Sequence, residues 1–138
     1  MTDATYLLDT NILSEMLRNP FGALVRHIDN FDRHKICTSA IVASEMRFGA
    51  HKKGAADLIR RVEALLTRVA VLPYTPEATH HYAAIRTDLE RRGTPIGWAD
   101  VYIAAHARSL GLTVVTANTR EFRRVPDLKV ENWLEDTP

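Results

Sequence analysis

The sequence predicts a single α/β domain in which a parallel sheet of four to five strands carries helices on both faces. Short apolar or β-branched runs alternate along the chain with longer segments of helical periodicity. The first run, Tyr6-Leu7-Leu8, is apolar throughout, which is typical of a strand covered on both faces. Alternation of such strands with helices favours a parallel sheet, because each parallel connection needs a crossover.

Length and composition indicate one ordinary globular domain over residues 1–138. The chain is 46% hydrophobic and 25% charged, and its net charge of +1 names no class of partner. Cys37 is the single cysteine, which excludes an internal disulfide, and we expect it to be buried. No leader-like segment opens the chain and no apolar run approaches the ~18 residues of a membrane span, so we expect a cytoplasmic protein.

Helical spacing of apolar residues predicts four helices and two strands in the first half of the chain. Asn19-Pro20 breaks the first helical pattern, and Gly54 lies where the third helix should end. The predicted elements are a strand at 6–8, helices at about 12–18 and 21–30, a strand at 34–38, and helices at 39–51 and 55–69.

The second half repeats this alternation with clear boundary residues. Pro76 suits the first turn of a helix, and Gly93 and Gly111 suit positions just beyond helix ends. The predicted elements are a strand at 69–72, helices at about 77–92 and 98–110, a strand at 113–116, a helical turn at 118–122 and a short strand at 128–131.

Asp9 directly follows the first predicted strand and, with Thr10 and Asn11, precedes a helical pattern. Ligands of open parallel sheets bind at the carboxyl ends of the strands, so Asp9 is a candidate metal ligand. Asp is also a frequent helix N-cap, and its position alone is compatible with that simpler role. Whether Asp9 is a metal ligand or only a helix cap depends on whether other acidic side chains lie close to it.

Glu45 interrupts an apolar row, because Ile41, Glu45 and Phe48 lie on one face of a predicted helix. A glutamate in such a row needs a cation or hydrogen bonds, since burial of an unpaired charge is costly. Arg47 and Lys52 are close in sequence, so an ion pair is the simpler explanation. The alternative explanation is a metal site that includes Glu45.

Asp100 similarly lies in a row with Ile96 and Ile103, within the first turn of a predicted helix, where the helix dipole alone would favour it. Strand ends and first helical turns surround one crevice in a doubly wound sheet. Several carboxylates there would repel one another unless they shared a cation, and oxygen ligands indicate Mg²⁺ or Mn²⁺. The residues that can face this crevice are Asp9, Glu45, Asp100 and Asn118.

Four motifs follow one another along nearly the whole chain. They are Leu8-Asp9-Thr10-Asn11; Thr38-Ser39 with Glu45 and Phe48-Gly49; Gly93-Thr94-Pro95-Ile96-Gly97 with Asp100 and Ile103-Ala104-Ala105-His106-Ala107; and Val115-Thr116-Ala117-Asn118-Thr119-Arg120-Glu121-Phe122. Each motif is weak alone, but the ordered set resembles that of PIN-domain proteins, specifically the VapC-type toxins of bacterial toxin–antitoxin systems.

The resemblance implies a three-layer α/β/α fold and a metal-dependent endoribonuclease that leaves a 5′-phosphate and a 3′-hydroxyl. Its acidic residues correspond to Asp9, Glu45 and Asp100, which would hold Mg²⁺ or Mn²⁺. Asn118 stands where the wider family often has Asp, which lowers the negative charge of the site and leaves open one metal or two. Trp98 stands where similar toxins often have proline, so RNA entry can differ.

The side chains around these acids divide into neutral donors and cations. We expect Thr10, Asn11, Ser39 and Thr116 to support the metal ligands through hydrogen bonds. Arg120, Arg47 and Arg86 are candidate RNA contacts, although a solvated surface position is the simpler explanation for each. Further cations available for a basic rim are Lys52, Lys53, Arg91 and Arg92.

The resemblance also implies partners. A cognate VapB-type antitoxin is expected to place a segment in a groove near the active site, and a homodimer is expected. Exposed apolar residues of the first helices, such as Phe21 or Leu24, would fit such surfaces.

Two other functions are compatible with the sequence. Metal-independent RNA cleavage by histidines predicts activity in a chelator and a 2′,3′-cyclic product, although we expect His106 to pack in the core. A non-catalytic module that binds protein or DNA would use the acids only as caps. A phosphoreceiver domain is disfavoured, because Glu131-Asn132-Trp133 replaces the switch lysine expected after the last strand.

Overall fold

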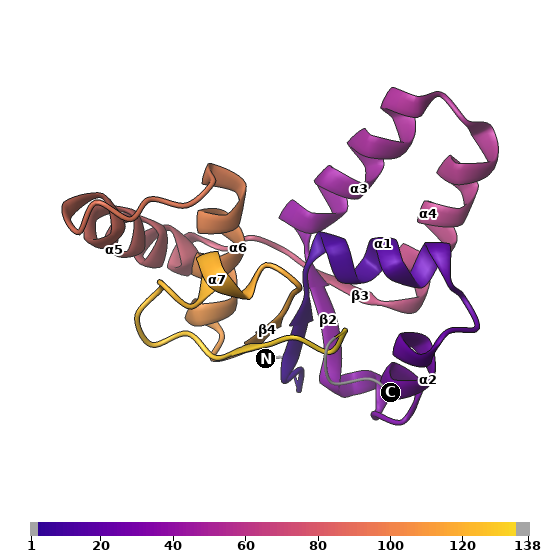
Figure 1. The fold of residues 1–138 in the computed structure, drawn as a ribbon, viewed down its shortest axis with the longest axis horizontal. Helices are drawn as coiled ribbons and strands as arrows, with labels where there is room; N and C mark the ends of the chain where they lie inside the picture. Colours follow the sequence, from indigo (N-terminus) through magenta and orange to yellow (C-terminus); the bar gives the residue numbers. More distant parts are fainter. Residues whose placement is uncertain (1–2, 135–138) are drawn as a thin grey trace.

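The computed structural model describes residues 3–134, which form a five-stranded sheet with every strand parallel to its neighbours. The strand order is β3-β2-β1-β4-β5, so β1 lies at the centre between β2 and β4 (Figure 1). The strands are β1 (Tyr6–Leu8), β2 (Ile36–Ser39), β3 (Ala70–Leu72), β4 (Thr113–Val115) and β5 (Val130–Glu131).

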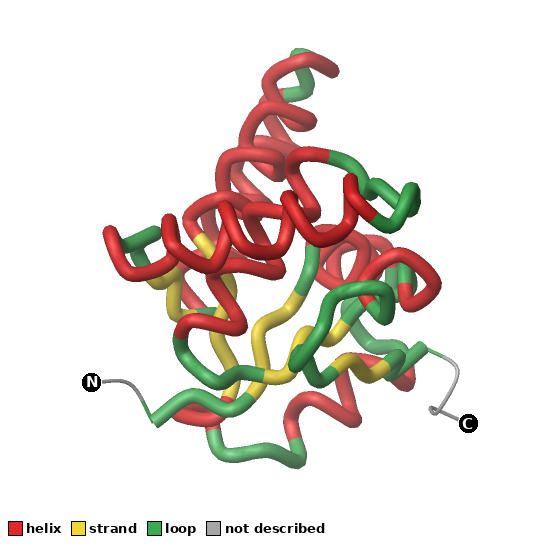
Figure 2. Tube along the Cα trace, turned by 90° about the vertical axis from the view of Figure 1, so that its left-hand side faces the viewer, coloured by secondary structure: helices red, strands yellow, loops and turns green. Residues whose placement is uncertain are grey.

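Helices cover both faces of this sheet. In Figure 1, α1 to α4 lie on one side of the strands and α5 to α7 on the other, and Figure 2 shows the strands running between them. The three-layer α/β/α fold is therefore confirmed. The helices of the described residues are α1 (Thr10–Arg18), α2 (Ala23–Asp29), α3 (Ala40–Lys53), α4 (Ala56–Arg68), α5 (Pro76–Arg91), α6 (Trp98–Ser109) and α7 (Thr119–Phe122), with a 3₁₀ turn η1 at Arg33–Lys35.

The central strands are buried as their apolar composition predicts. Leu7 and Leu8 of β1 and Val114 of β4 have no exposed surface. Cys37 is also buried, as expected, and burial raises the pKa of its thiol to about 12. Within residues 3–134, no helix combines the length and apolar character needed to cross a membrane.

The second strand begins later than the sequence predicts. Residues 33–35 form the 3₁₀ turn, and the Asp32 carboxylate accepts a hydrogen bond from the His34 backbone N–H at 3.0 Å. A short acidic side chain that bonds the backbone two residues on competes with strand pairing. The prediction of strand structure at His34 and Lys35 was therefore wrong, and β2 starts at Ile36.

The predicted reason for placing Glu45 near the site was also wrong. Phe48 is 68% exposed, so the row that it shares with Ile41 and Glu45 is not a buried face. Glu45 lies at the edge of the core-facing side of α3 and is half-buried. The core-facing residues of α3 are Val42, Ala43, Met46 and Ala50.

Candidate active site

Asp9 lies at the junction of β1 and α1, where the central strand ends, and only 3% of it is exposed. Its Oδ1 caps α1 by accepting a hydrogen bond from the Thr10 backbone N–H at 2.8 Å. Its Oδ2 accepts from Thr116 Oγ1 at 2.8 Å and from Asn11 Nδ2 at 3.3 Å. The helix cap considered from the sequence is therefore present, but it uses only one oxygen of a carboxylate that also faces the end of β4.

Hydrogen bonds join the ends of the two central strands. Thr116 Oγ1 accepts from the Asn118 backbone N–H at 2.9 Å, and Asn11 Oδ1 accepts from the Ala117 backbone N–H at 2.9 Å. Strands β1 and β4 pair in parallel, and the order of the sheet reverses between them. Open α/β sheets bind ligands in the crevice at such a switch point.

Glu45 reaches this crevice from α3. Thr10 Oγ1 donates a hydrogen bond to Glu45 Oε1 at 2.7 Å, so the first residue of α1 links the carboxylates of two elements. Arg47, one of the two cations considered as an ion-pair partner for Glu45, instead forms a bidentate ion pair with Glu63 at 2.9 Å on the exposed surface. The simpler ion-pair explanation with Arg47 was therefore wrong.

Asp100 reaches the crevice from the first turn of α6. Its Oδ2 accepts a hydrogen bond from Asn118 Nδ2 at 3.1 Å, which connects it to the loop after β4. Asn118 therefore touches one acid through its side chain, and its backbone N–H bonds the threonine that supports Asp9. A single cleft with a volume of about 370 Å³ is lined by Asp9, Thr10, Asn11, Ser14, Arg18, Glu45, Asp100 and Asn118.

The acids of the cleft disfavour one another's ionised forms. Burial, and after it the charges of Asp9, Glu45 and Glu121, raise the pKa of Asp100 to about 6. Burial also raises the pKa of Asp9, against the opposing effect of its hydrogen bonds from Thr116 and Thr10. Such a cluster carries electrostatic strain that a bound cation would relieve.

Comparison with known proteins identifies the family. Residues 6–128 match the PIN domain. The chain belongs to the PIN-domain family. It is 40% identical over 131 residues to ribonuclease VapC2 of Haemophilus influenzae, covering 94% of this chain and 98% of that protein. It is 40% identical over 129 residues to the tRNA(fMet)-specific endonuclease VapC of Shigella flexneri, covering 93% and 97%.

Solved structures of similar proteins also support membership of this family. The crystal structure of VapBC2 from Rickettsia felis bound to a promoter DNA fragment matches with a TM-score of 0.87 and 31% identity, over 94% of this chain and 98% of that one. DNA-bound VapBC from Salmonella typhimurium matches with a TM-score of 0.85 and 38% identity, over 96% and 99%. The resemblance of this PIN domain to VapC-type proteins is confirmed.

The donor chemistry of the cleft fits a hard divalent cation. Three carboxylates, from the β1–α1 junction, α3 and α6, line it together with an amide, and Asp9 and Asp100 have raised pKa values. Among residues 3–134, no group of three or more His, Cys, Asp and Glu side chains is arranged to hold a metal ion by itself. Mg²⁺ commonly uses one or two carboxylates and keeps several waters, so an open arrangement of this kind suits it.

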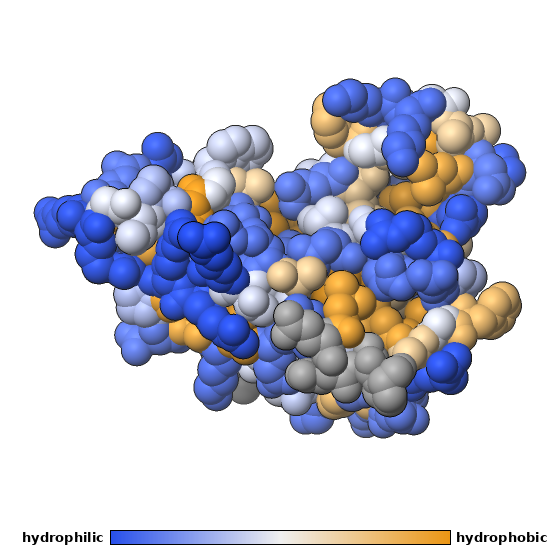
Figure 3. Space-filling view, in the orientation of Figure 1, coloured by the Kyte–Doolittle hydropathy of each residue, from blue (hydrophilic) through white to orange (hydrophobic). Residues whose placement is uncertain are grey.

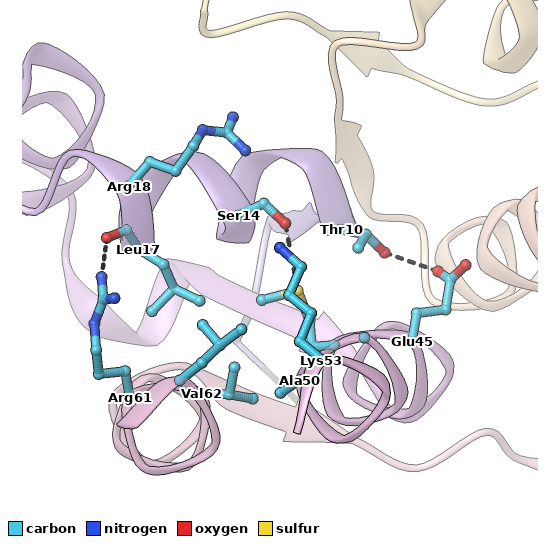
Figure 4. A pocket seen from close by; sticks show the side chains of 12 residues that line it. Thr10, Ser14, Leu17, Arg18, Glu45, Ala50, Lys53, Arg61 and Val62 are labelled. Atoms are coloured by element: carbon cyan, nitrogen blue, oxygen red, sulfur yellow. Dashed lines mark hydrogen bonds between the residues drawn. The ribbon is translucent and has the colours of Figure 1, made fainter. Parts of the chain in front are cut away.

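A second hollow adjoins the acidic cleft in this PIN domain. It lies between α1 and the α3–α4 hairpin, has a volume of about 310 Å³ and shares Thr10, Ser14, Arg18 and Glu45 with the cleft. Figure 4 shows Leu17, Ala50 and Val62 on its floor, and Figure 3 shows hydrophobic surface between α3 and α4. The cations at its margin are Arg18, Lys53 and Arg61, the last of which donates a hydrogen bond to the Leu17 carbonyl.

The expected apolar partner surface on the first helices is present only in part. Phe21, between α1 and α2, is 88% exposed, which agrees with the expectation. Leu24 is only 4% exposed because it packs in the core under α2, so its inclusion in an exposed surface was wrong.

The predicted supporting residues divide into two groups. Thr10, Asn11 and Thr116 all bond an acid of the cleft. Ser39 is buried and caps α3 by accepting from the Ile41 backbone N–H at 3.0 Å, and its Oγ lies 2.7 Å from His106 Nδ1. The Ser39 hydroxyl therefore bonds the α3 backbone and His106 and forms no hydrogen bond with the three acids of the cleft. His106 is fully buried, as expected.

The candidate RNA-binding arginines lie on different helices. Arg120 is exposed on α7, directly after the loop that bonds Asp9 and Asp100. Arg86 lies on α5 and bonds Glu90 Oε2 and the Tyr82 hydroxyl, both at 2.8 Å. Sequence reasoning missed Arg18, which lines the cleft itself. The sequence could have predicted this position, because Thr10, Ser14 and Arg18 are spaced four residues apart and therefore share one face of α1.

Proposed function

We propose that this PIN domain is a cytoplasmic RNA-cleaving hydrolase that requires Mg²⁺ or Mn²⁺. The observation that carries the proposal is that Asp9, Glu45 and Asp100, from three separate elements, line one cleft at the switch point of the sheet. The ribonuclease and endonuclease names of the 40%-identical relatives support RNA as the substrate. No histidine is among the residues that line this cleft within 3–134, which disfavours histidine-based cleavage.

Each polar residue of the cleft has a separate role in the proposed cleavage. Asp9 and Asp100 would hold the cation, and Asn118 would orient Asp100 through its amide. Glu45, held by Thr10, would position the attacking water or accept its proton. A bound divalent ion supplies a water of lowered pKa and neutralises charge on the phosphate. Attack by water leaves a 5′-phosphate and a 3′-hydroxyl.

The test is cleavage of total RNA by the purified protein in Mg²⁺, Mn²⁺ or chelator, with product ends mapped. We expect cleavage only with metal, and a loss of at least about 100-fold in Asp9→Asn and Asp100→Asn, as for removal of groups that act on the reacting atoms. Asp57→Asn is the matched control, because Asp57 is an exposed carboxylate on α4. Activity in chelator or a 2′,3′-cyclic end would refute the metal-dependent mechanism.

We further propose that a VapB-type antitoxin silences this enzyme by filling the hollow between α1 and the α3–α4 hairpin. The support is that the similar solved structures are VapBC complexes and that the hollow adjoins the acidic cleft. A partner segment seated there can reach Glu45 and Arg18, which line both depressions. We also expect the free protein to form a homodimer, which its mass in solution tests.

A further inference from the structure

Trp98 is an aromatic side chain left largely outside the folded core. It is the first residue of α6 and is 70% exposed, whereas the other tryptophan, Trp133, is 2% exposed. Large aromatic rings bury most of their surface in folded proteins, and exposed ones often mark contacts with ligands or partners. The exposure of Trp98 therefore calls for an explanation.

Packed aromatic rings hold Trp98 in place from one side. Its ring meets Tyr102 edge to face at 6.3 Å between centroids, with an interplanar angle of 87°. Tyr102 in turn stacks on Tyr82 of α5 at 4.4 Å and 28°, and it contacts Tyr74 at 5.5 Å. The indole is thus supported at its base while most of its surface stays accessible.

Trp98 lies in the same helical turn as one acid of the cleft, although Trp98 is not itself among the residues that line the cleft. It precedes Asp100 by two residues in the same helical turn, and a Cβ built on the adjoining Gly97 would lie 3.8 Å from Asp100 Oδ2. An RNA phosphate held at Asp100 would therefore bring its flanking nucleotide close to Trp98. The closeness of Trp98 to Asp100 along α6 favours the substrate over an unrelated partner as the occupant.

A hollow of about 360 Å³ lies under Trp98 and between α5 and the loop before α6. Its apolar walls carry a polar rim, because Arg86 and Glu90 pair at 2.8 Å and both side chains are about half exposed. Guanidinium donors and carboxylate acceptors can meet the edge of a base, and an aromatic ring can meet its face. The residues lining this hollow are Arg86, Leu89, Glu90, Pro95, Ile96, Gly97, Trp98 and Val101.

We propose that Trp98 stacks on an unpaired RNA base next to the cleaved phosphate. This inference rests on the proposed ribonuclease function. Bases in a duplex are already stacked on their neighbours, so only an unpaired base can place its face on a side chain. Arg86, a candidate RNA contact from the sequence, contributes as part of this hollow.

The kinetic test compares wild type, Trp98→Phe and Trp98→Ala on a single-stranded oligoribonucleotide that contains a mapped cleavage site. We expect Trp98→Ala to lower kcat/KM by about 5- to 100-fold, the range for loss of one base–aromatic stack, and Trp98→Phe to retain most of it. A second set of substrates each lacks one base beside the cleaved bond. On the substrate that lacks the base contacted by Trp98, wild type and Trp98→Ala should have the same kcat/KM. Phe21→Ala, which removes another largely exposed ring far along the chain from the acid of α6, should leave cleavage unchanged.

A binding test separates this inference from the proposed function. In the Asp9→Asn background, a short oligoadenylate should quench Trp98 emission, and its abasic counterpart should not, while buried Trp133 should be unaffected. Equal cleavage by wild type and Trp98→Ala, or equal losses on all abasic substrates, would overturn the stacking role alone. Unchanged cleavage with weakened antitoxin binding would assign Trp98 to a protein interface. Failure of wild type to cut any RNA would instead refute the enzyme, with quenching still deciding whether Trp98 meets a base.

Discussion

The hydroxyl of Thr10 at the start of α1 donates a hydrogen bond to Glu45 Oε1 on α3 over 2.7 Å. This bond sets the direction of the glutamate that we assign to the attacking water, while the Thr10 backbone N–H bonds Asp9. A hydrogen bond to a charged group contributes about 1.5–3 kcal/mol, so its loss should be visible in the rate.

We therefore expect Thr10→Val to lower kcat on RNA by about 10- to 100-fold, which corresponds to that free energy. Thr10→Ser keeps the hydroxyl and should retain most activity. Cleavage kinetics at saturating Mg²⁺ measure both variants. Equal rates in Thr10→Val and wild type would show that Glu45 needs no support from α1.

The pH dependence of stability should report the strain on Asp100. Its pKa is raised from 3.8 to about 6, first by burial and then by neighbouring charges. Between these values the folded chain binds more protons than the unfolded chain, so the free energy of unfolding falls as pH rises and stays reduced above pH 6. Without metal, Asp100→Asn should remove this fall and raise stability at neutral pH by on the order of 1 kcal/mol.

Urea denaturation of metal-free protein across this pH range measures the effect. Added Mn²⁺ should stabilise wild type more than Asp100→Asn, because a ligand that binds the folded state raises its stability. Asp57→Asn, whose carboxylate pairs with Arg60 on the surface, is the control and should keep the wild-type profile. Parallel profiles for wild type and Asp100→Asn would contradict the assigned pKa.

Ser39 offers a test of structural against catalytic support. Its buried Oγ caps α3 and lies 2.7 Å from His106 Nδ1 on α6, so it joins the helices that carry Glu45 and Asp100. Ser39→Ala should lower the free energy of unfolding by about 1–3 kcal/mol, since a cap is lost and a buried polar atom is left unpaired.

At a temperature where Ser39→Ala remains folded, its cleavage rate should stay within a few-fold of wild type. Ser44→Ala, on the exposed side of the same helix, should change neither property. A large loss of rate without loss of stability would instead support the metal-supporting role expected from the sequence.

The hollow beside the cleft predicts a separation of antitoxin binding from catalysis. Leu58 of α4 lines this hollow but not the acidic cleft. Leu58→Asp should weaken binding of the cognate antitoxin by about 10-fold or more, because truncating or charging an interface anchor commonly costs over 1 kcal/mol. RNA cleavage by the free protein should be unchanged. Calorimetry measures the affinity, with Leu110→Asp, outside the hollow, as control; equal weakening in both variants would place the antitoxin elsewhere.

The fold was largely predictable because helix and strand periodicity is a local property. Apolar spacing predicted the alternation of helices and strands, and the strand-terminal position of Asp9 predicted its place at the ligand-binding edge. The errors arose where side chains compete locally, as at Asp32, or where a helix face was assigned without its neighbours, as at Phe48. Burial of Leu24 was likewise decided by what packs against α2.

By itself, the sequence determined the order of the elements, the candidate acids and the family to which they belong. Only the tertiary structure decided which oxygens meet: Thr116 bonds Asp9 across 107 residues, and Thr10 bonds Glu45 across 35. The physical reason is that periodicity specifies the apolar face of each element, whereas a polar side chain chooses among partners that strand order and register bring within reach. Ser39 illustrates this, since its partner His106 lies 67 residues further along the chain, on α6.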